Sequence, residues 1–412
     1  MEDIVNKTFS SLSVRNYRLF IAGQAISLCG TWMQTVAISW LVLEITHSGT
    51  ILGLAIAAQF MPILLFGIWG GLIADRFNKR KILLLTQSTF AILALIFGIT
   101  VLTHNIHLWI IFVLAVLIGL VQVVDTPTRQ SFVIEMVGPK NVKNAVTLNS
   151  TMVNTARVIG PSIGGVLIAT IGIGMCFIVN SFSFIAVLAA IYLMRVSELR
   201  PAPVTPREPG QLKAGFDYIM SEPKLKVTLI MMFIIGTFAY EFPVVFPLFA
   251  TKVLHGHVGT FSSMMVATGI GAVIGGLYTA GHAVERESQI IWTALFFGIS
   301  IIVTAFMPSY FLVLVSLLFV GALSVLFIAL GNSTLQLTSL PSMRGRVMSF
   351  WAIAFAGTTP IGGPIIGYIC DHTNPRIGLA VGGLSSIIAA GIAFWIYKNK
   401  HESSNQLNLE TN

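Results

Sequence analysis

Residues 51–81 read ILGLAIAAQFMPILLFGIWGGLIADRFNKRK. The first part, from Ile51 to Ala74, is an almost uninterrupted apolar run, and a cluster of basic residues follows it directly. An apolar run of about 20 residues is long enough to cross the hydrocarbon core of a bilayer as a helix. Basic residues collect at the cytoplasmic ends of such helices. This stretch therefore predicts a membrane-spanning helix followed by a cytoplasmic loop.

The composition of the whole chain agrees with this prediction. Of its 412 residues, 55% are hydrophobic and only 10% are charged, whereas a soluble domain averages roughly 25% charged residues. An ordinary soluble enzyme and a disordered protein are therefore excluded. The three cysteines, Cys29, Cys176 and Cys370, lie in or beside apolar runs, so we expect neither a disulfide nor a metal site.

Apolar runs of spanning length follow one another along the chain and predict an all-α membrane protein with twelve transmembrane helices. Six of them precede a polar segment and six follow it, which predicts an N-terminal half (1–195), a cytoplasmic linker (196–226) and a C-terminal half (227–412). The second part of the linker, 211–220, has the pattern of a short amphipathic helix. The predicted spans are 19–42, 51–74, 82–102, 108–124, 145–171, 175–193, 227–249, 261–280, 290–306, 311–330, 350–369 and 377–396.

The distribution of basic residues predicts the orientation in the membrane. Of the 24 lysines and arginines, 21 lie in the N-terminus, the linker, the C-terminus and the alternate loops on the same side. The opposite loops contain only Lys252 and Arg376, and Arg157 lies within a span. Because lysine and arginine are enriched in cytoplasmic loops, both termini are predicted to be cytoplasmic.

Glycine and proline interruptions occur at matching positions of the two halves. Gly70-Gly71 in the second span corresponds to Gly275-Gly276 in the eighth, and the fifth and eleventh spans each carry a Gly/Pro-rich segment. Such paired interruptions are typical of transporters built from repeats, with the binding site between the repeats. The alternative is that the glycines only permit close helix packing.

The loop after the second span combines one carboxylate with several cations. It contains Gly71, Asp75, Arg76 and Arg80 in an ordered spacing. Asp75 can accept hydrogen bonds from the N-terminus of a neighbouring helix, and the arginines can bridge to carboxylates. The segment resembles the G-x-x-x-D-R/K-x-G-R-R/K loop of the major facilitator superfamily, with Asn78 in place of the second glycine.

A second motif lies in the fifth span. Gly160, Pro161, Gly164 and Gly165, preceded by Arg157, resemble the G-P-x-x-G-G motif of proton-coupled drug exporters of the superfamily. Proline at this position loosens a helix, and the glycines let it approach a neighbour. Ala156 stands where the fuller motif has another glycine. The resemblance implies antiport rather than uptake by symport.

Further segments narrow the resemblance. They resemble the branch of the superfamily that contains macrolide efflux proteins and the enterobactin exporter, and the resemblance covers nearly the whole chain. It implies a twelve-helix transporter whose two halves rock around a central cavity. The segments are 125–130, 145–149, 240–247 and 344–348.

Charged residues within spans are costly and are candidates for function. Glu241 is the candidate proton carrier, although it is also suited to fixing the helix around Tyr240. Arg157 either holds an anionic group of the substrate or pairs with a carboxylate of another helix. Asp125 is expected to face the loop after the second span in an inner gate. The gate residues are Gly71, Asp75, Arg76, Arg80, Asp125 and Arg129.

The first span carries a polar stripe that predicts one wall of a substrate cavity. Its members recur at steps of three and four, which places them on one face of a helix. Hydrogen bonding between helices is the alternative explanation. In the resembled architecture the first, fourth, seventh and tenth spans line the central cavity. The resemblance therefore implies that the cavity residues are Gln24, Ser27, Thr31, Gln34, Gln122, Thr237, Tyr240, Asn332 and Gln336.

These features predict a transporter and not an enzyme. The resemblance implies a secondary transporter that exports drug-like or amphipathic small molecules in exchange for protons. The alternatives are a dedicated exporter of a siderophore or another anionic metabolite, and a receptor or scaffold that does not transport. The chain has no ATP-binding loop of the G-x-x-x-x-G-K-[ST] type, so we expect no cofactor. We expect a monomer in a bacterial inner membrane, with the substrate, protons and the lipid bilayer as partners and no nucleic acid.

Overall fold

The computed structural model describes residues 10–200, 211–281, 288–340 and 343–410. The side chains of a few residues within these ranges, Asp75 among them, are not described. The described ranges contain helices and no strands. Twelve helical segments in them are long and apolar enough to cross a membrane. The predicted all-α class with twelve membrane-spanning helices is therefore confirmed.

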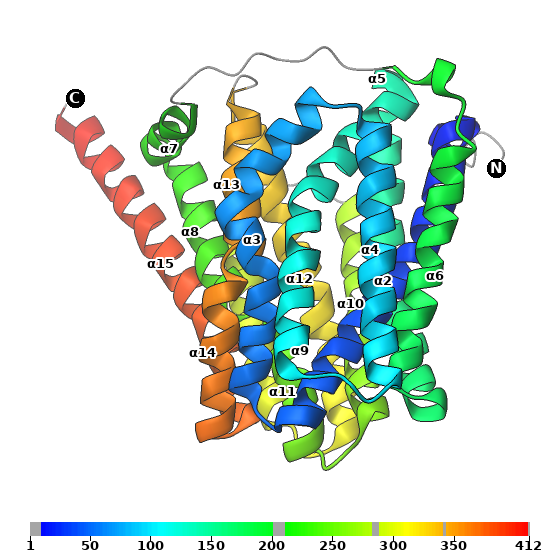
Figure 1. The fold of residues 1–412 in the computed structure, drawn as a ribbon. Helices are drawn as coiled ribbons and strands as arrows, with labels where there is room; N and C mark the ends of the chain where they lie inside the picture. The colour runs from blue at the N-terminus through cyan, green and yellow to red at the C-terminus, as the bar shows by residue number, and fades with distance from the viewer. Residues whose placement is uncertain (1–9, 201–210, 282–287, 341–342, 411–412) are drawn as a thin grey trace.

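We call the helices that precede the linker, drawn from blue to green in Figure 1, the N-terminal half. Gly49 begins its second long helix one short turn after the first, because Ser48 caps the new helix by accepting a hydrogen bond from the Ile51 amide. The helices are α2 (Arg15–Thr46), α3 (Gly49–Arg76), α4 (Lys79–Leu102), α5 (Leu108–Ile171) and α6 (Ile173–Tyr192), preceded by the short η1 (Ser10–Ser13).

The helices after the linker form the C-terminal half. The linker contains η2 (Val196–Glu198) and α7 (Gln211–Ser221). The end of the bundle at which α2 begins and α15 ends is called the terminal end, and the opposite end the far end (Figure 1). The helices of this half are α8 (Pro223–Phe238), α9 (Phe242–Lys252), α10 (Val258–Gly281), α11 (Ser288–Phe306), α12 (Tyr310–Thr338), α13 (Arg344–Ala356), α14 (Thr359–His372) and α15 (Pro375–Glu410).

The fourth and fifth spans are joined without an extended loop, which differs from the prediction. Helix α5 covers both spans, and its interior departs from helical backbone angles at Gly138, where φ is 69°. The predicted end of the fourth span at residue 124 was therefore too early. The polar residues that follow it continue the helix. This part of the helix faces a cavity and not lipid, so its polar side chains are not transferred into hydrocarbon.

Two spans of the C-terminal half are discontinuous. The seventh is divided into α8 and α9, and the eleventh into α13 and α14. Each second segment has a proline in its first turn, where the missing N–H costs nothing and the fixed φ favours a new start. The two breaks are adjacent, because a Cβ placed on Gly236 would lie 2.4 Å from the carbonyl oxygen of Ala354. Discontinuous helices near the middle of a membrane are typical of transport sites.

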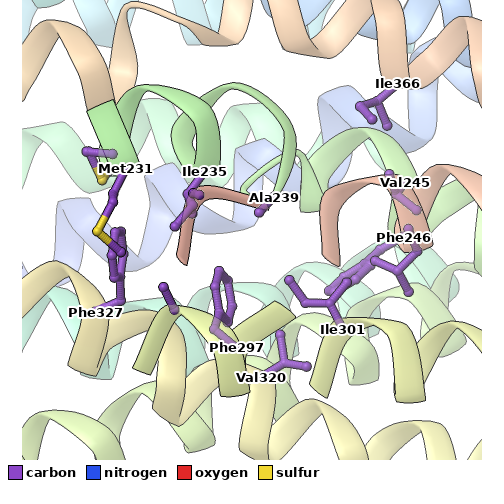
Figure 2. Close-up of a cluster of buried hydrophobic side chains, with 14 of the residues drawn as sticks. Met231, Ile235, Ala239, Val245, Phe246, Phe297, Ile301, Val320, Phe327 and Ile366 are labelled. Carbon is purple, nitrogen blue, oxygen red and sulfur yellow. The ribbon is translucent and has the colours of Figure 1, made fainter. Parts of the chain in front are cut away.

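A continuous apolar cluster fills the centre of the C-terminal half (Figure 2). Phe246 of α9, Phe297 of α11 and Phe327 of α12 are completely buried in it. Met231 and Ile235 of α8 pack against the same cluster and are also completely buried. This packing holds α8, α9, α11 and α12 together, so that the helix breaks have fixed surroundings.

Close helix packing in the C-terminal half depends on individual glycines. A Cβ on Gly321 of α12 would lie 1.9 Å from the carbonyl oxygen of Thr268 in α10. We predict that Gly321→Val lowers the free energy of unfolding by about 1–3 kcal/mol, because the two backbones must separate. Thermal unfolding of the purified protein measures the change. Gly391→Val is the control, because no atom of a neighbouring helix lies within 4 Å of its Cβ position. Equal stability of the two variants would contradict the prediction.

Candidate functional site

A cavity of about 2150 Å³ lies between the two halves. The N-terminal half contributes the polar stripe of α2, with Gln24, Ser27, Thr31 and Gln34 on the cavity wall. Gln122 of α5 and Tyr240, at the break between α8 and α9, also line it. The polar face of α2 therefore borders a chamber large enough for a small molecule.

The cavity extends to the terminal end of the bundle. Its wall includes Arg76 at the last residue of α3, Lys213 of α7 and Arg346 in the first turn of α13. At the far end α3 and α14 lie side by side (Figure 1), and a Cβ on Gly53 would be 2.2 Å from the carbonyl oxygen of Gly363. The chamber is thus accessible from the terminal end and closed at the far end.

Three residues predicted to line the cavity do not line it: Thr237, Asn332 and Gln336. Thr237 is buried, and its hydroxyl donates to the carbonyl oxygen of Phe233. Gln336 donates to Asn332 within α12. Polarity within a span does not reveal which face of the helix meets the other half, and for these residues the helix itself supplies a hydrogen-bond partner.

Arg157 of α5 is the central charge of the site. Its guanidinium lies over the ring of Trp32 in α2, 4.9 Å from the ring centroid, and it lines the cavity. Its Nε atom is buried without a hydrogen-bond partner. Within the described ranges no ion pair involves Arg157, so pairing with a carboxylate of another helix, one of the two expected arrangements, is not formed.

The other charges of the cavity wall are mostly positive. Among the lining residues with described side chains, five are basic and one, Asp125, is acidic. The Asp125 side chain is only 1% exposed and forms an ion pair with Arg129 at 3.1 Å. The field inside the chamber is therefore positive. The basic residues are Arg76, Arg129, Arg157, Lys213 and Arg346.

Asp125 has its partners within the N-terminal half. Besides Arg129, its Oδ1 accepts hydrogen bonds from the Thr86 hydroxyl at 2.7 Å and the Gln87 amide at 2.8 Å, both on α4. Arg80 instead donates to the carbonyl oxygens of Ile191 and Tyr192 at the end of α6. Asp125 and Arg80 thus do not form the expected network with each other.

The remaining gate candidates are located at the cavity mouth. Gly71 and Arg76 of α3 line the cavity, and Arg76 is exposed. Asp75 belongs to the last turn of the same helix, but its side chain lies outside the described part of the structure.

The glycine motif of α5 is the place where this helix approaches two others. A Cβ on Gly160 would lie 2.6 Å from the carbonyl oxygen of Cys29 in α2, and one on Gly165 would lie 2.5 Å from the hydroxyl of Ser262 in α10. The backbone of α5 remains helical through Pro161, so the expected loosening is not a break. The motif, which also includes Gly164 against Met33, allows α5 to pack between the two halves.

Glu241 lies behind the cavity wall at the junction of the two helix breaks. It is 3% exposed, and its Oε1 has no hydrogen-bond partner. Its carboxyl group interacts with the side chain of Thr359, which does line the cavity. The Oε2 atom is 3.4 Å from a Cβ position on Gly363, the residue that contacts Gly53 of α3. Glu241 is thus next to both the chamber and the contact that closes the far end.

Three residues of this arrangement were not found from the sequence. Trp32 is adjacent to the polar stripe of α2, but its ring contact with Arg157 depends on how α2 and α5 pack. Gln87 resembles an ordinary polar residue of a span. Asp371 lies in the last turn of α14, and its partner Ser48 lies more than 300 positions earlier, so only the fold brings them together.

Within the described residues, no group of three or more histidine, cysteine, aspartate or glutamate side chains is arranged to hold a metal ion.

Comparison with known proteins supplies the family context. A family model described as transmembrane secretion effector matches residues 6–411. The staphyloferrin A transporter of Staphylococcus aureus is 24% identical over 396 residues, covering 94% of this chain and 98% of that protein. The enterobactin exporter EntS of Citrobacter koseri is 24% identical over 378 residues, covering 90% of this chain and 89% of that protein.

Solved structures share the fold. A bacterial homologue of the human lysosomal transporter Spinster, in an inward-facing and unoccupied conformation, matches with a TM-score of 0.71 and 15% identity, over 93% of this chain and 97% of that chain. A POT family transporter in complex with 5-aminolevulinic acid matches with a TM-score of 0.75 and 12% identity, over 92% of this chain and 95% of that chain.

The position of the cavity wall is testable by chemical labelling. In a background in which Cys29, Cys176 and Cys370 are replaced, we predict that Thr31→Cys reacts rapidly with a hydrophilic maleimide added at the terminal end. Thr237→Cys is the comparison, because it occupies a buried position on a broken span. We expect at least about tenfold slower labelling there, and similar rates would show that the wall is assigned to the wrong faces.

Proposed function

Because this chain belongs to the transmembrane secretion effector family of the major facilitator superfamily, we propose that it exports a small anionic molecule of the siderophore kind in exchange for protons. As a secondary transporter it uses an ion gradient. Its two halves alternate between exposing the chamber at the terminal end and exposing it at the far end.

The observation that carries the proposal is the unpaired charge of Arg157. A charged group taken out of water into the middle of a membrane protein is costly unless an opposite charge compensates it. Trp32 offsets only part of this cost through its ring. A carboxylate or phenolate oxygen of a substrate would complete the compensation, and a guanidinium binds such groups with two parallel hydrogen bonds.

Two further facts support an anionic substrate. The mouth of the chamber is lined by Arg76, Lys213 and Arg346, and a cleft of one charge attracts ligands of the opposite charge. The relatives named for transport of staphyloferrin A and enterobactin cover most of this chain. These relatives support a substrate of the siderophore kind.

Glu241 is the proposed proton carrier. Its carboxyl group contacts Thr359 on the cavity side and lies next to the α3–α14 contact on the other. While the chamber faces the terminal end, that contact separates Glu241 from the far end. When α3 and α14 move apart, the carboxyl group gains access to the far end and can take up a proton there. The proton is then released at the terminal end after the halves return.

The orientation follows from the basic residues. The terminal end is the cytoplasmic side, with both termini and the linker there, because 21 of 24 basic residues lie on that side. The membrane is the bacterial inner membrane.

In the opposite state Gly71, Asp75 and Arg76 close the cytoplasmic mouth. One chain forms a complete chamber, which supports a working monomer.

Efflux of amphipathic drugs is the second candidate, and the aromatic part of the wall favours it. A wide chamber with many aromatic side chains binds apolar molecules of varied shape. Cationic dyes and anionic chelators distinguish the two functions, because the positive field favours only the latter. The aromatic lining residues are Trp32, Phe60, Phe90, Phe184, Tyr240, Phe242 and Phe355.

Arg157 is tested in everted membrane vesicles with an imposed proton gradient, acid inside. We predict that the wild-type protein accumulates staphyloferrin A or enterobactin, and that Arg157→Gln lowers the initial rate at least about tenfold, since a buried charge contact is removed. Arg157→Lys keeps the charge without the bidentate geometry and should retain part of the rate.

Undiminished transport by Arg157→Gln would contradict anion binding at this residue. Accumulation of ethidium instead of the chelators would favour drug efflux. If no compound in the panel accumulates although the protein is folded, the receptor or scaffold function replaces transport.

The role of Glu241 is tested by measuring proton-driven transport and substrate exchange separately. We predict that Glu241→Gln abolishes gradient-driven accumulation but still exchanges labelled for unlabelled substrate, because the chamber is intact and only the proton carrier is missing. Glu44→Gln is the control, because Glu44 is an exposed carboxylate at the far end of α2. Gradient-driven accumulation by Glu241→Gln would show that another group carries the proton.

A further inference from the structure

At the far end, one carboxylate of the C-terminal half is hydrogen-bonded to a helix of the N-terminal half. Asp371, at the end of α14 in the C-terminal half, reaches the first turn of α3 in the N-terminal half. Its Oδ1 accepts a hydrogen bond from the Gly49 amide at 2.8 Å. Its Oδ2 accepts from the Ser48 hydroxyl at 2.7 Å, the Thr50 amide at 2.8 Å and the Thr50 hydroxyl at 2.9 Å. Asp371 is therefore a cap for a helix of the other half.

The chemistry of this contact is favourable in several ways at once. The first amides of a helix lack partners within the helix and carry its partial positive charge. A carboxylate accepts hydrogen bonds from these amides and neutralises the partial charge. Hydrogen bonds to an ionised acceptor are also stronger than hydrogen bonds between neutral groups. Lys252 at the end of α9 adds an ion pair with Oδ1 at 3.1 Å. The Asp371 side chain is 16% exposed, so water screens these interactions only partly.

The contact between Asp371 and the first turn of α3 depends on the distance between α3 and α14. A Cβ on Gly367 would lie 2.1 Å from the carbonyl oxygen of Gly49, so the two backbones touch without side chains between them. Two of the hydrogen bonds of Asp371 come from the backbone amides of Gly49 and Thr50, which cannot move independently of helix α3. A separation of a few ångströms breaks all four together.

We propose that Asp371, with Lys252, is a latch that is formed only when the far end is closed, and that its strength sets the balance between the two conformations of the protein. Opening of the far end requires α3 and α14 to separate, and the latch must then release Ser48, Gly49 and Thr50 at once. The role is independent of which molecule occupies the chamber.

The test measures conformation directly. Spin labels are placed on Asn105→Cys and Thr373→Cys, which are exposed at the far end of the two halves, and on Lys81→Cys and Arg344→Cys, which are exposed at the terminal end. The native cysteines are replaced in all samples, and distances are recorded by pulsed electron resonance in lipid nanodiscs without substrate. For Asp371→Asn we expect longer distances at the far end and shorter ones at the terminal end. The ratio of far-end-open to far-end-closed molecules should rise at least about tenfold.

Two smaller changes keep the test decisive if Asp371→Asn does not fold. Lys252→Gln removes only the ion pair and Thr50→Val only one hydroxyl donor, so each should produce the same shift to a smaller extent. Glu44→Gln, an exposed carboxylate at the same end, should leave the distances unchanged. Unaltered distance distributions in the Asp371, Lys252 and Thr50 variants would overturn the latch. Failure of chelator transport alone would overturn the proposed function and not the latch.

Discussion

The hydrocarbon interior of a membrane offers no hydrogen bonds to the polypeptide backbone, and this constraint governs the whole architecture. Continuous helices satisfy their own amides and carbonyls, so they can face lipid. The breaks between α8 and α9 and between α13 and α14 cannot, and they are found where protein and a chamber surround them. The irregular backbone around Tyr240 and Thr358 is therefore confined to the part of the molecule where a bound molecule and a proton can also be held.

Because water is lacking, a charge inside the bundle is costly unless groups of the protein compensate it. Asp125 and Asp371 are each surrounded by three or more donors, so their charges are compensated within the protein. Arg157 and the Oε1 atom of Glu241 are not. Complete compensation is characteristic of residues that hold helices together. Incomplete compensation is concentrated beside the chamber, where a substrate or a proton can supply what is missing.

The class of fold followed from the sequence because length and apolarity of a span are local properties. The predicted end of a span was wrong where polar residues face the cavity and not the water outside the membrane, as in α5 beyond residue 124. Within the site, the stripe containing Gln24 and Thr31 was found because four residues repeat on one face. Thr237, Asn332 and Gln336 do not belong to such a four-residue stripe, and their side chains are hydrogen-bonded within their own helices. The partners of Arg157 and Asp371 come from other helices, and no spacing along the chain encodes them.

The backbone and the side chain of Arg157 belong to different parts of the molecule. Because Pro161 has no amide hydrogen, the carbonyl oxygen of Arg157 has no helical donor, and it lies 3.0 Å from the Cβ position of Gly269 in the other half. The side chain of Arg157 points to the chamber, while its backbone belongs to the contact between the halves. Under the proposed function, a change of that side chain would alter what the chamber binds without altering the backbone contact between the halves.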